Sequence, residues 1–208
     1  MALPPDRVAR SIPLADSPSI DRFLPRPDVS ERYELDVRAP AELVFEVAEK
    51  FDLPSIPAVH FIFWLRGKLL RSAASPPRWP DGLLAATTAI GWGILSRRPG
   101  RELVMGAVTQ PWLADVKFRP IPPEEFTAFA EPDCVKIVWT LETEPLAPAH
   151  TRLRTETRAA ATDEEARRKF LRYWRWARAG IFPIRWFLLP AVRRASQRRH
   201  RESSAPSA

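Results

Sequence analysis

The sequence predicts an α+β domain in which a curved antiparallel sheet is covered by a long C-terminal helix. Three observations indicate this class. Short segments of alternating polar and apolar residues cluster in the middle of the chain, helical periodicities flank them, and the last periodic segment carries an aromatic stripe. Clustered strands with segregated helices are typical of the α+β class. A sheet with one apolar face needs cover, and the last helix supplies it.

The terminal helix is expected from Thr162 to Ala179, where Thr162 and Glu165 have the spacing of a capping box. Arginines occupy most positions outside its apolar stripe, so the helix has to bury that stripe against a broad apolar surface. Gly180 is expected to break or bend the helix before helical spacing resumes. The stripe consists of Ala166, Phe170, Tyr173, Trp174 and Ala177.

The strands are expected where polar and apolar residues alternate. In the clearest of them, the polar residues Arg152, Arg154, Glu156 and Arg158 are assigned to solvent. Pro99-Gly100 is expected to form a turn between two of the shorter strands. The predicted strands are Ser30–Val37, Gly91–Ser96, Arg101–Gln110, Val116–Pro120, Cys134–Glu144 and Thr151–Ala161.

Two short helices are expected after the first strand. The first runs from Ala41 to Asp52, directly after Pro40, and the second is the very apolar segment from about Pro57 to Leu70. A further short helix through Leu83, Leu84 and Ala85 would be capped by Asp81, and another is expected at 122–129.

The length of 208 residues suits one domain with an arm or tail, or at most two small domains. Residues 1–28 contain six prolines and are expected to form an extended arm. The domain is expected at 29–199, with a basic helical extension at 180–199, and 200–208 is expected to be a disordered tail.

Charge and composition exclude several classes of function. The net charge of +7 lies mainly after Arg167, and we see no nucleic-acid-binding motif, so no nucleic-acid partner is expected. The single Cys134 excludes an intrachain disulfide and fits a reducing compartment. Without a recognisable signal peptide or an apolar run of about 18 residues, we expect a cytoplasmic protein. No cofactor is expected, because phosphate-loop and dinucleotide motifs are absent. No metal is expected, because a single Cys forms no cluster and His60, His150 and His200 do not form a ligand set.

The run from Glu34 to Glu49, ELDVRAPAELVFEVAE, resembles the opening of the START-like, polyketide cyclase/dehydrase-like superfamily (SRPBCC, with the Bet v 1 fold). The resemblance extends to the strand and amphipathic helix near the end of the domain. It implies a helix-grip fold, with an apolar cavity for lipids, polyketides, sterols or aromatic compounds, but no catalytic residue. The residues of the opening motif are Val37, Ala39, Pro40, Glu42, Val44 and Phe45.

A cavity between the sheet and the last helix is therefore the expected binding site for a hydrophobic small molecule. Sites of this kind are mostly apolar, with a few polar groups for orientation. The same side chains could instead fill a packed core, and the inward hydroxyls of Thr155 and Thr157 require a backbone or ligand partner. The expected lining residues are Trp139, Leu141, Leu153, Thr155, Phe170, Tyr173, Trp174 and Ala177.

Two other classes of function remain open. A cyclase/dehydrase-like enzyme would need a polar residue deep in the cavity, for which His60 and Tyr173 are the candidates. Binding without catalysis is the expectation, because His60 has no visible carboxylate or nucleophile partner. A peripheral membrane or protein-interaction module would use the basic and aromatic end of the chain against an anionic surface. Its candidate residues are Arg185, Trp186, Phe187 and Arg193.

Overall fold

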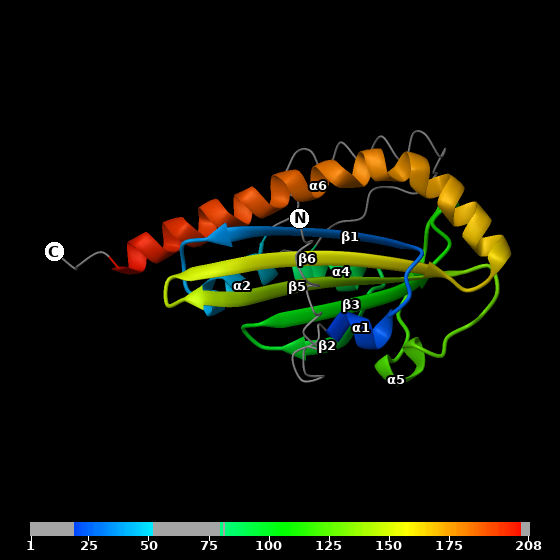
Figure 1. Ribbon diagram of the computed structural model, residues 1–208, viewed down its shortest axis with the longest axis horizontal. Helices are drawn as coiled ribbons and strands as arrows, with labels where there is room; N and C mark the ends of the chain where they lie inside the picture. Colours follow the sequence, from blue (N-terminus) through cyan, green and yellow to red (C-terminus); the bar gives the residue numbers. More distant parts are fainter. Residues whose placement is uncertain (1–18, 52–79, 81, 205–208) are drawn as a thin grey trace, which may run out of the picture.

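A computed structural model describes residues 19–51, 80 and 82–204, and for 178–187 it describes the backbone alone. The architecture is α+β, with one curved antiparallel sheet gripping a long C-terminal helix, as the sequence predicts (Figure 1). The elements are α1 (Ser19–Phe23), β1 (Val29–Val37), α2 (Ala41–Glu49), α4 (Leu83–Ala89), β2 (Gly93–Arg98), β3 (Glu102–Thr109), β4 (Phe118–Arg119), α5 (Pro123–Phe126), β5 (Val135–Ala147), β6 (His150–Ala161) and α6 (Glu164–Ser204).

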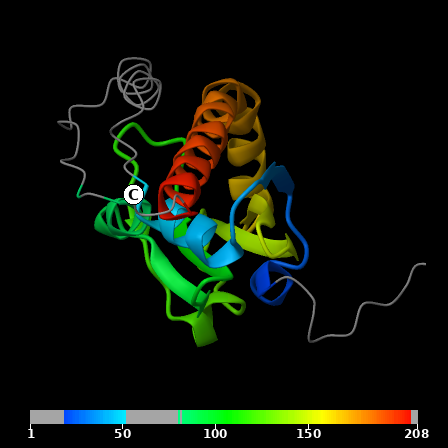
Figure 2. The ribbon, with the colours of Figure 1, turned by 90° about the vertical axis from the view of Figure 1, so that its left-hand side faces the viewer.

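The sheet has the strand order β1-β6-β5-β3-β2, and β4 also pairs with β3. Every pairing is antiparallel, and the β5–β6 hairpin is the longest. The strand predictions are confirmed to within a few residues at each end. Figure 2 shows α6 and α2 on one face of the sheet and the short helix α1 on the other.

The expected helix at 57–70 and the expected cap Asp81 lie outside the described residues. The helix after them, α4, has Gly82 at its N-cap with a positive φ of 92° and no side-chain cap bond. Glycine adopts such a φ without steric cost, which explains why a glycine occupies this position.

The outer face of the sheet carries an apolar cluster that the sequence interpretation did not anticipate. The last residues of the expected extended arm form α1, whose Ile20 and Phe23 are buried against this face. Phe126 of α5 packs edge-on against Phe23, with ring centroids 6.3 Å apart. The outer face is therefore not polar throughout, because this apolar cluster is buried at one end of it. The remaining members are Leu24, Leu95, Val104, Val138 and Ala160.

Glu156 was expected in solvent but is 6% exposed. Its Oε1 lies 2.6 Å from Nε of Arg158, and Arg158 in turn pairs with Asp21 of α1 at 2.5 Å. Arg158 also donates to the backbone oxygen of Leu24. The side chain points to the predicted face of the strand, and α1 and its ion pairs bury it there.

The N-terminus of α6 is capped by Asp163, not by the predicted Thr162. Asp163 Oδ1 accepts the backbone N–H of Ala166 at 2.7 Å, and its Oδ2 accepts that of Asp133 at 2.5 Å. The hydroxyl of Thr162 instead exchanges hydrogen bonds with the backbone of Cys134. The cap therefore ties the start of α6 to the start of β5.

Gly180 was expected to break or bend the helix, and it does not break it, because α6 is continuous from Glu164 to Ser204. Figure 1 shows that the helix is curved along its length. Near its C-terminal end, Leu189 and Val192 are buried in the cluster that contains α2. Arg199 also pairs with Glu46 of α2 at 3.2 Å, so this part of α6 is held against α2.

Replacing Phe23 with alanine should lower the free energy of unfolding by about 3 kcal/mol, because it removes a buried ring from the outer cluster. The matched control is Leu146→Ala, whose side chain lies on the exposed β5–β6 hairpin and should change stability by less than about 0.5 kcal/mol. Urea unfolding measures both values. Equal stabilities of the two variants would contradict the packing of α1 on the sheet.

The two backbone hydrogen bonds lower the pKa of the Asp163 carboxyl, the bond from Ala166 having the larger effect. A depressed pKa in the folded state stabilises the fold above the unfolded value of about 3.9, and this contribution is lost as the pH falls through the folded value. Asp163→Asn keeps a capping oxygen but cannot titrate. Stability measured from neutral pH into acid should therefore fall less steeply in Asp163→Asn than in the wild type. Identical slopes would show that Asp163 has no such role.

Candidate ligand-binding site

Strand register determines which side chains face α6. Directly paired residues of antiparallel strands point to the same side of the sheet. One row on the concave face therefore consists of Tyr33, Thr155, Leu141 and Leu103. The adjacent row consists of Glu31, Thr157, Trp139 and Met105.

Trp139 stands near the middle of this face. Its indole N–H donates to the hydroxyl of Thr155 at 2.9 Å. Thr155 is almost fully buried, whereas Trp139 is only partly buried. The partner of the Thr155 hydroxyl is thus a side chain, and the bond fixes the orientation of the indole ring.

The two ends of the concave face are packed. At the α2 end, Leu141 and Leu153 lie in a buried cluster with Val44 and Leu189. At the other end, Phe170 of α6 is buried against the sheet. Between these clusters Tyr33, Trp139 and Ile137 stay partly exposed, although α6 crosses the face.

The predicted lining residues therefore divide between these environments. Trp139 and Thr155 lie at the middle of the face, and Ala177 of α6 is half-buried. The buried apolar members belong to the packed ends, where Tyr173 and Trp174 are half-buried against Phe170. These buried apolar members are Leu141, Leu153 and Phe170.

Of the candidate catalytic residues, His60 lies outside the described residues. Tyr173 lies at the packed end near the start of α6. Burial raises the pKa of the Cys134 thiol, which makes it a poorer nucleophile at neutral pH. The candidate membrane residues Arg185, Trp186 and Phe187 lack described side chains.

Glu31 is a polar residue on the concave face that the sequence interpretation did not select. It is half-buried and pairs directly with Thr157, which pairs with Trp139 on its other side. The alternation of Tyr33, Leu35 and Val37 extends back to Glu31 and could have identified it. The row thus combines a carboxylate, a hydroxyl and an indole ring.

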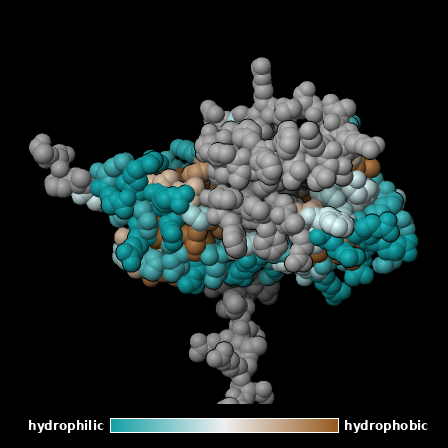
Figure 3. Space-filling view, turned by 90° about the horizontal axis from the view of Figure 1, so that it is seen from above, coloured by the Kyte–Doolittle hydropathy of each residue, from teal (hydrophilic) through white to brown (hydrophobic). Residues whose placement is uncertain are grey.

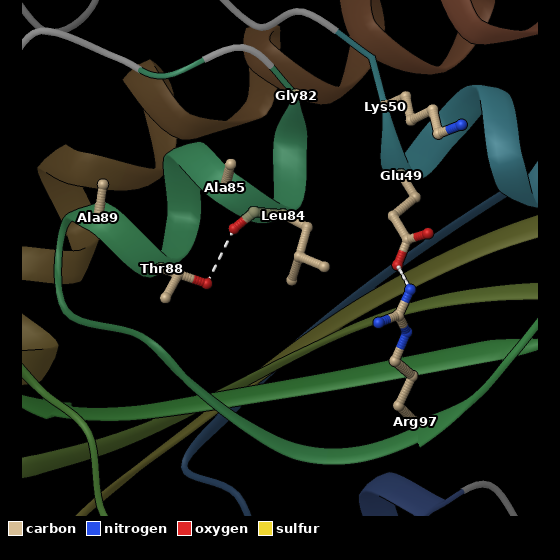
Figure 4. Close-up of a pocket in the computed structure, with 8 residues that line it drawn as sticks. All are labelled: Glu49, Lys50, Gly82, Leu84, Ala85, Thr88, Ala89 and Arg97. Atoms are coloured by element: carbon tan, nitrogen blue, oxygen red, sulfur yellow. Dashed lines mark hydrogen bonds and ion pairs between the residues drawn. The ribbon is translucent and has the colours of Figure 1, made fainter.

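A second concavity lies between α2, α4 and β2 and has a volume of about 830 Å³ (Figure 4). At one side, Arg97 pairs with Glu49 at 2.6 Å. Among the described residues, the wall of this cleft contains none of the predicted lining residues and no aromatic side chain, so we place the candidate site on the concave face instead. It is lined by Glu49, Lys50, Gly82, Leu84, Ala85, Thr88, Ala89 and Arg97.

Within the described ranges, no group of three or more His, Cys, Asp or Glu side chains could hold a metal ion. Nor does any helix in this part of the chain have the length and apolar character needed to cross a membrane. Arg193, the fourth candidate membrane residue, is exposed on α6.

No protein-family model matches the sequence, and no curated protein matches it. Similar solved structures include the Zhui aromatase/cyclase from Streptomyces sp. R1128, at 15% identity and a TM-score of 0.31, covering 85% of this chain and 98% of that one. A conserved protein from Geobacillus kaustophilus has 10% identity and a TM-score of 0.33, covering 83% of this chain and 97% of that one. At these scores, the fold assignment rests on the strand order and register of this chain itself.

Proposed function

We propose that the concave face binds a hydrophobic small molecule, held between the middle of the sheet and α6. The observation that supports this most directly is the partial exposure of Tyr33, Trp139 and Ile137 between two packed ends. Aromatic side chains offer large apolar areas that a ligand can cover. The START-like resemblance of the sequence implies ligands of the same chemistry.

The binding energy would come mainly from burial of apolar surface. Each 100 Å² covered contributes about 2.5 kcal/mol before the costs of association are subtracted. Because Thr155 already holds the Trp139 indole, little side-chain freedom would be lost when a flat ligand stacks on it.

The polar groups of the Trp139 row would set the orientation of the ligand. Glu31 carries a carboxylate and Thr157 a hydroxyl on this row. A flat apolar compound with a hydroxyl group at one end would match this row, with its ring on Trp139 and its hydroxyl directed toward Glu31.

A cyclase/dehydrase-like reaction is the second candidate, and the same row favours it. A carboxylate within hydrogen-bond reach of a bound substrate can act as a general acid or base. In that case Glu31→Gln would abolish turnover of a bound substrate while changing its affinity by a smaller factor. In a binding protein, Glu31→Gln would affect affinity alone.

Trp139→Ala should weaken the binding of an apolar fluorescent dye by about tenfold, because it removes the ring that forms the floor of the site. Thr155→Val should have a smaller effect, since it frees the indole without deleting it. Leu146→Ala is the control for an apolar truncation on the same hairpin, and it should leave dye affinity unchanged. Lipids and hydroxylated aromatic compounds should displace the dye.

Circular dichroism and urea unfolding separate loss of binding from loss of folding in each variant. Full dye affinity in folded Trp139→Ala would contradict the proposed site. Dye that no lipid or aromatic compound displaces would contradict the proposed ligand class.

A further inference from the structure

Trp176 of α6 is 81% exposed, by far the highest value among the large hydrophobic side chains that are described. Trp174, two residues earlier, packs toward the sheet. Two residues of an α-helix turn through about 200°, so Trp176 points away from the concave face. The indole of Trp176 therefore takes no part in the packing of the domain.

Positive charge surrounds this indole. Arg172, one turn before Trp176, and Arg175, next to it, are both exposed and have no acidic partner among the described residues. Arg167, further toward the start of the helix, pairs instead with Asp28 at 2.8 Å. The arginines on the outer face of α6 are therefore ion-paired near the start of the helix and have no acidic partner among the described residues near Trp176.

The charge of the whole chain is concentrated in this helix. Residues 164–204 contain twelve Lys or Arg and three Asp or Glu, a net charge of +9, whereas the full chain has +7. The rest of the chain is therefore slightly acidic. Seen from the α6 side, hydrophilic residues cover both ends of the molecule (Figure 3).

We propose that the outer face of α6 around Trp176 docks on an anionic phospholipid surface. An indole has an apolar body and a polar N–H, which suits the headgroup region of a bilayer. The unpaired arginines Arg172 and Arg175 beside it are attracted by the negative surface potential of such a membrane. Because no described helix could span a membrane, the contact would be peripheral.

An anionic bilayer explains the exposed ring better than a nucleic acid or an acidic protein does. The arginines alone could bind a phosphate backbone, so nucleic-acid binding would not explain the exposed ring. Proteins that bind single strands stack the bases on several aromatic side chains, whereas the described part of the chain presents a single ring here. The proposal does not depend on ligand binding at the concave face. The candidate membrane residues of the alternative interpretation of the sequence, Arg185, Trp186, Phe187 and Arg193, lie further along the same helix.

Cosedimentation of the full chain with vesicles tests this surface. Vesicles of equal parts phosphatidylserine and phosphatidylcholine should bind the protein, vesicles of phosphatidylcholine alone should bind it far more weakly, and salt should weaken binding. Trp176→Ala should lower the partition coefficient about tenfold, with partial recovery in Trp176→Phe. Arg172→Ala with Arg175→Ala should lower it about thirtyfold, because each basic side chain near such a surface contributes about fivefold.

Two controls match these changes outside α6. Leu146→Ala removes an exposed apolar side chain, and Arg101→Ala with Lys117→Ala removes two exposed positive charges. Leu146→Ala should leave partitioning unchanged, and the charge control should lower it far less than the α6 pair. Equal losses in the two charge variants, unchanged binding of Trp176→Ala, or equal binding to both kinds of vesicle would each overturn the proposal. So would binding to duplex DNA or to an acidic polypeptide without binding to vesicles.

Discussion

The register between β5 and β6 is the constraint on which the rest of the structure depends. These strands pair from Val135–Ala161 to Ala147–His150, and β1 and β3 take their registers from them. A shift of one residue would turn Arg154 and Arg158 toward α6 and Thr155 toward solvent. The aromatic rows of the concave face and the charged rows of the outer face are two consequences of this one pairing.

The two ends of α6 are fixed by different interactions. Asp163 and the buried Phe170 attach its start to β5, while Leu189 and Arg199 attach its later part to the sheet and α2. Between these two attachments α6 crosses the concave face, and Trp139 of the sheet stays partly exposed there.

Local alternation was enough to predict the strands and the side to which most of their residues point. It could not predict the burial of Glu156, because that depends on α1, a helix within a proline-containing segment far away in the sequence. The predicted capping box does not form, since the hydroxyl of Thr162 bonds the backbone of Cys134 and Asp163 caps the helix through the backbone N–H of Ala166. Glu31 was not selected as a site residue for a different reason. It is charged, whereas the other residues of the same alternation, Tyr33, Leu35 and Val37, are apolar or aromatic.

Helix α6 covers the concave face, and its outer face carries the proposed membrane surface around Trp176. Phe170 and Trp174 face the sheet, where their burial stabilises the fold, whereas Trp176 faces solvent and contributes no packing. Substitutions of exposed residues usually change stability by less than about 0.5 kcal/mol, while loss of a buried ring costs several times as much. Variants of Trp176 therefore leave the domain folded and its concave face intact, so the outer surface and the ligand site can each be altered without disturbing the other.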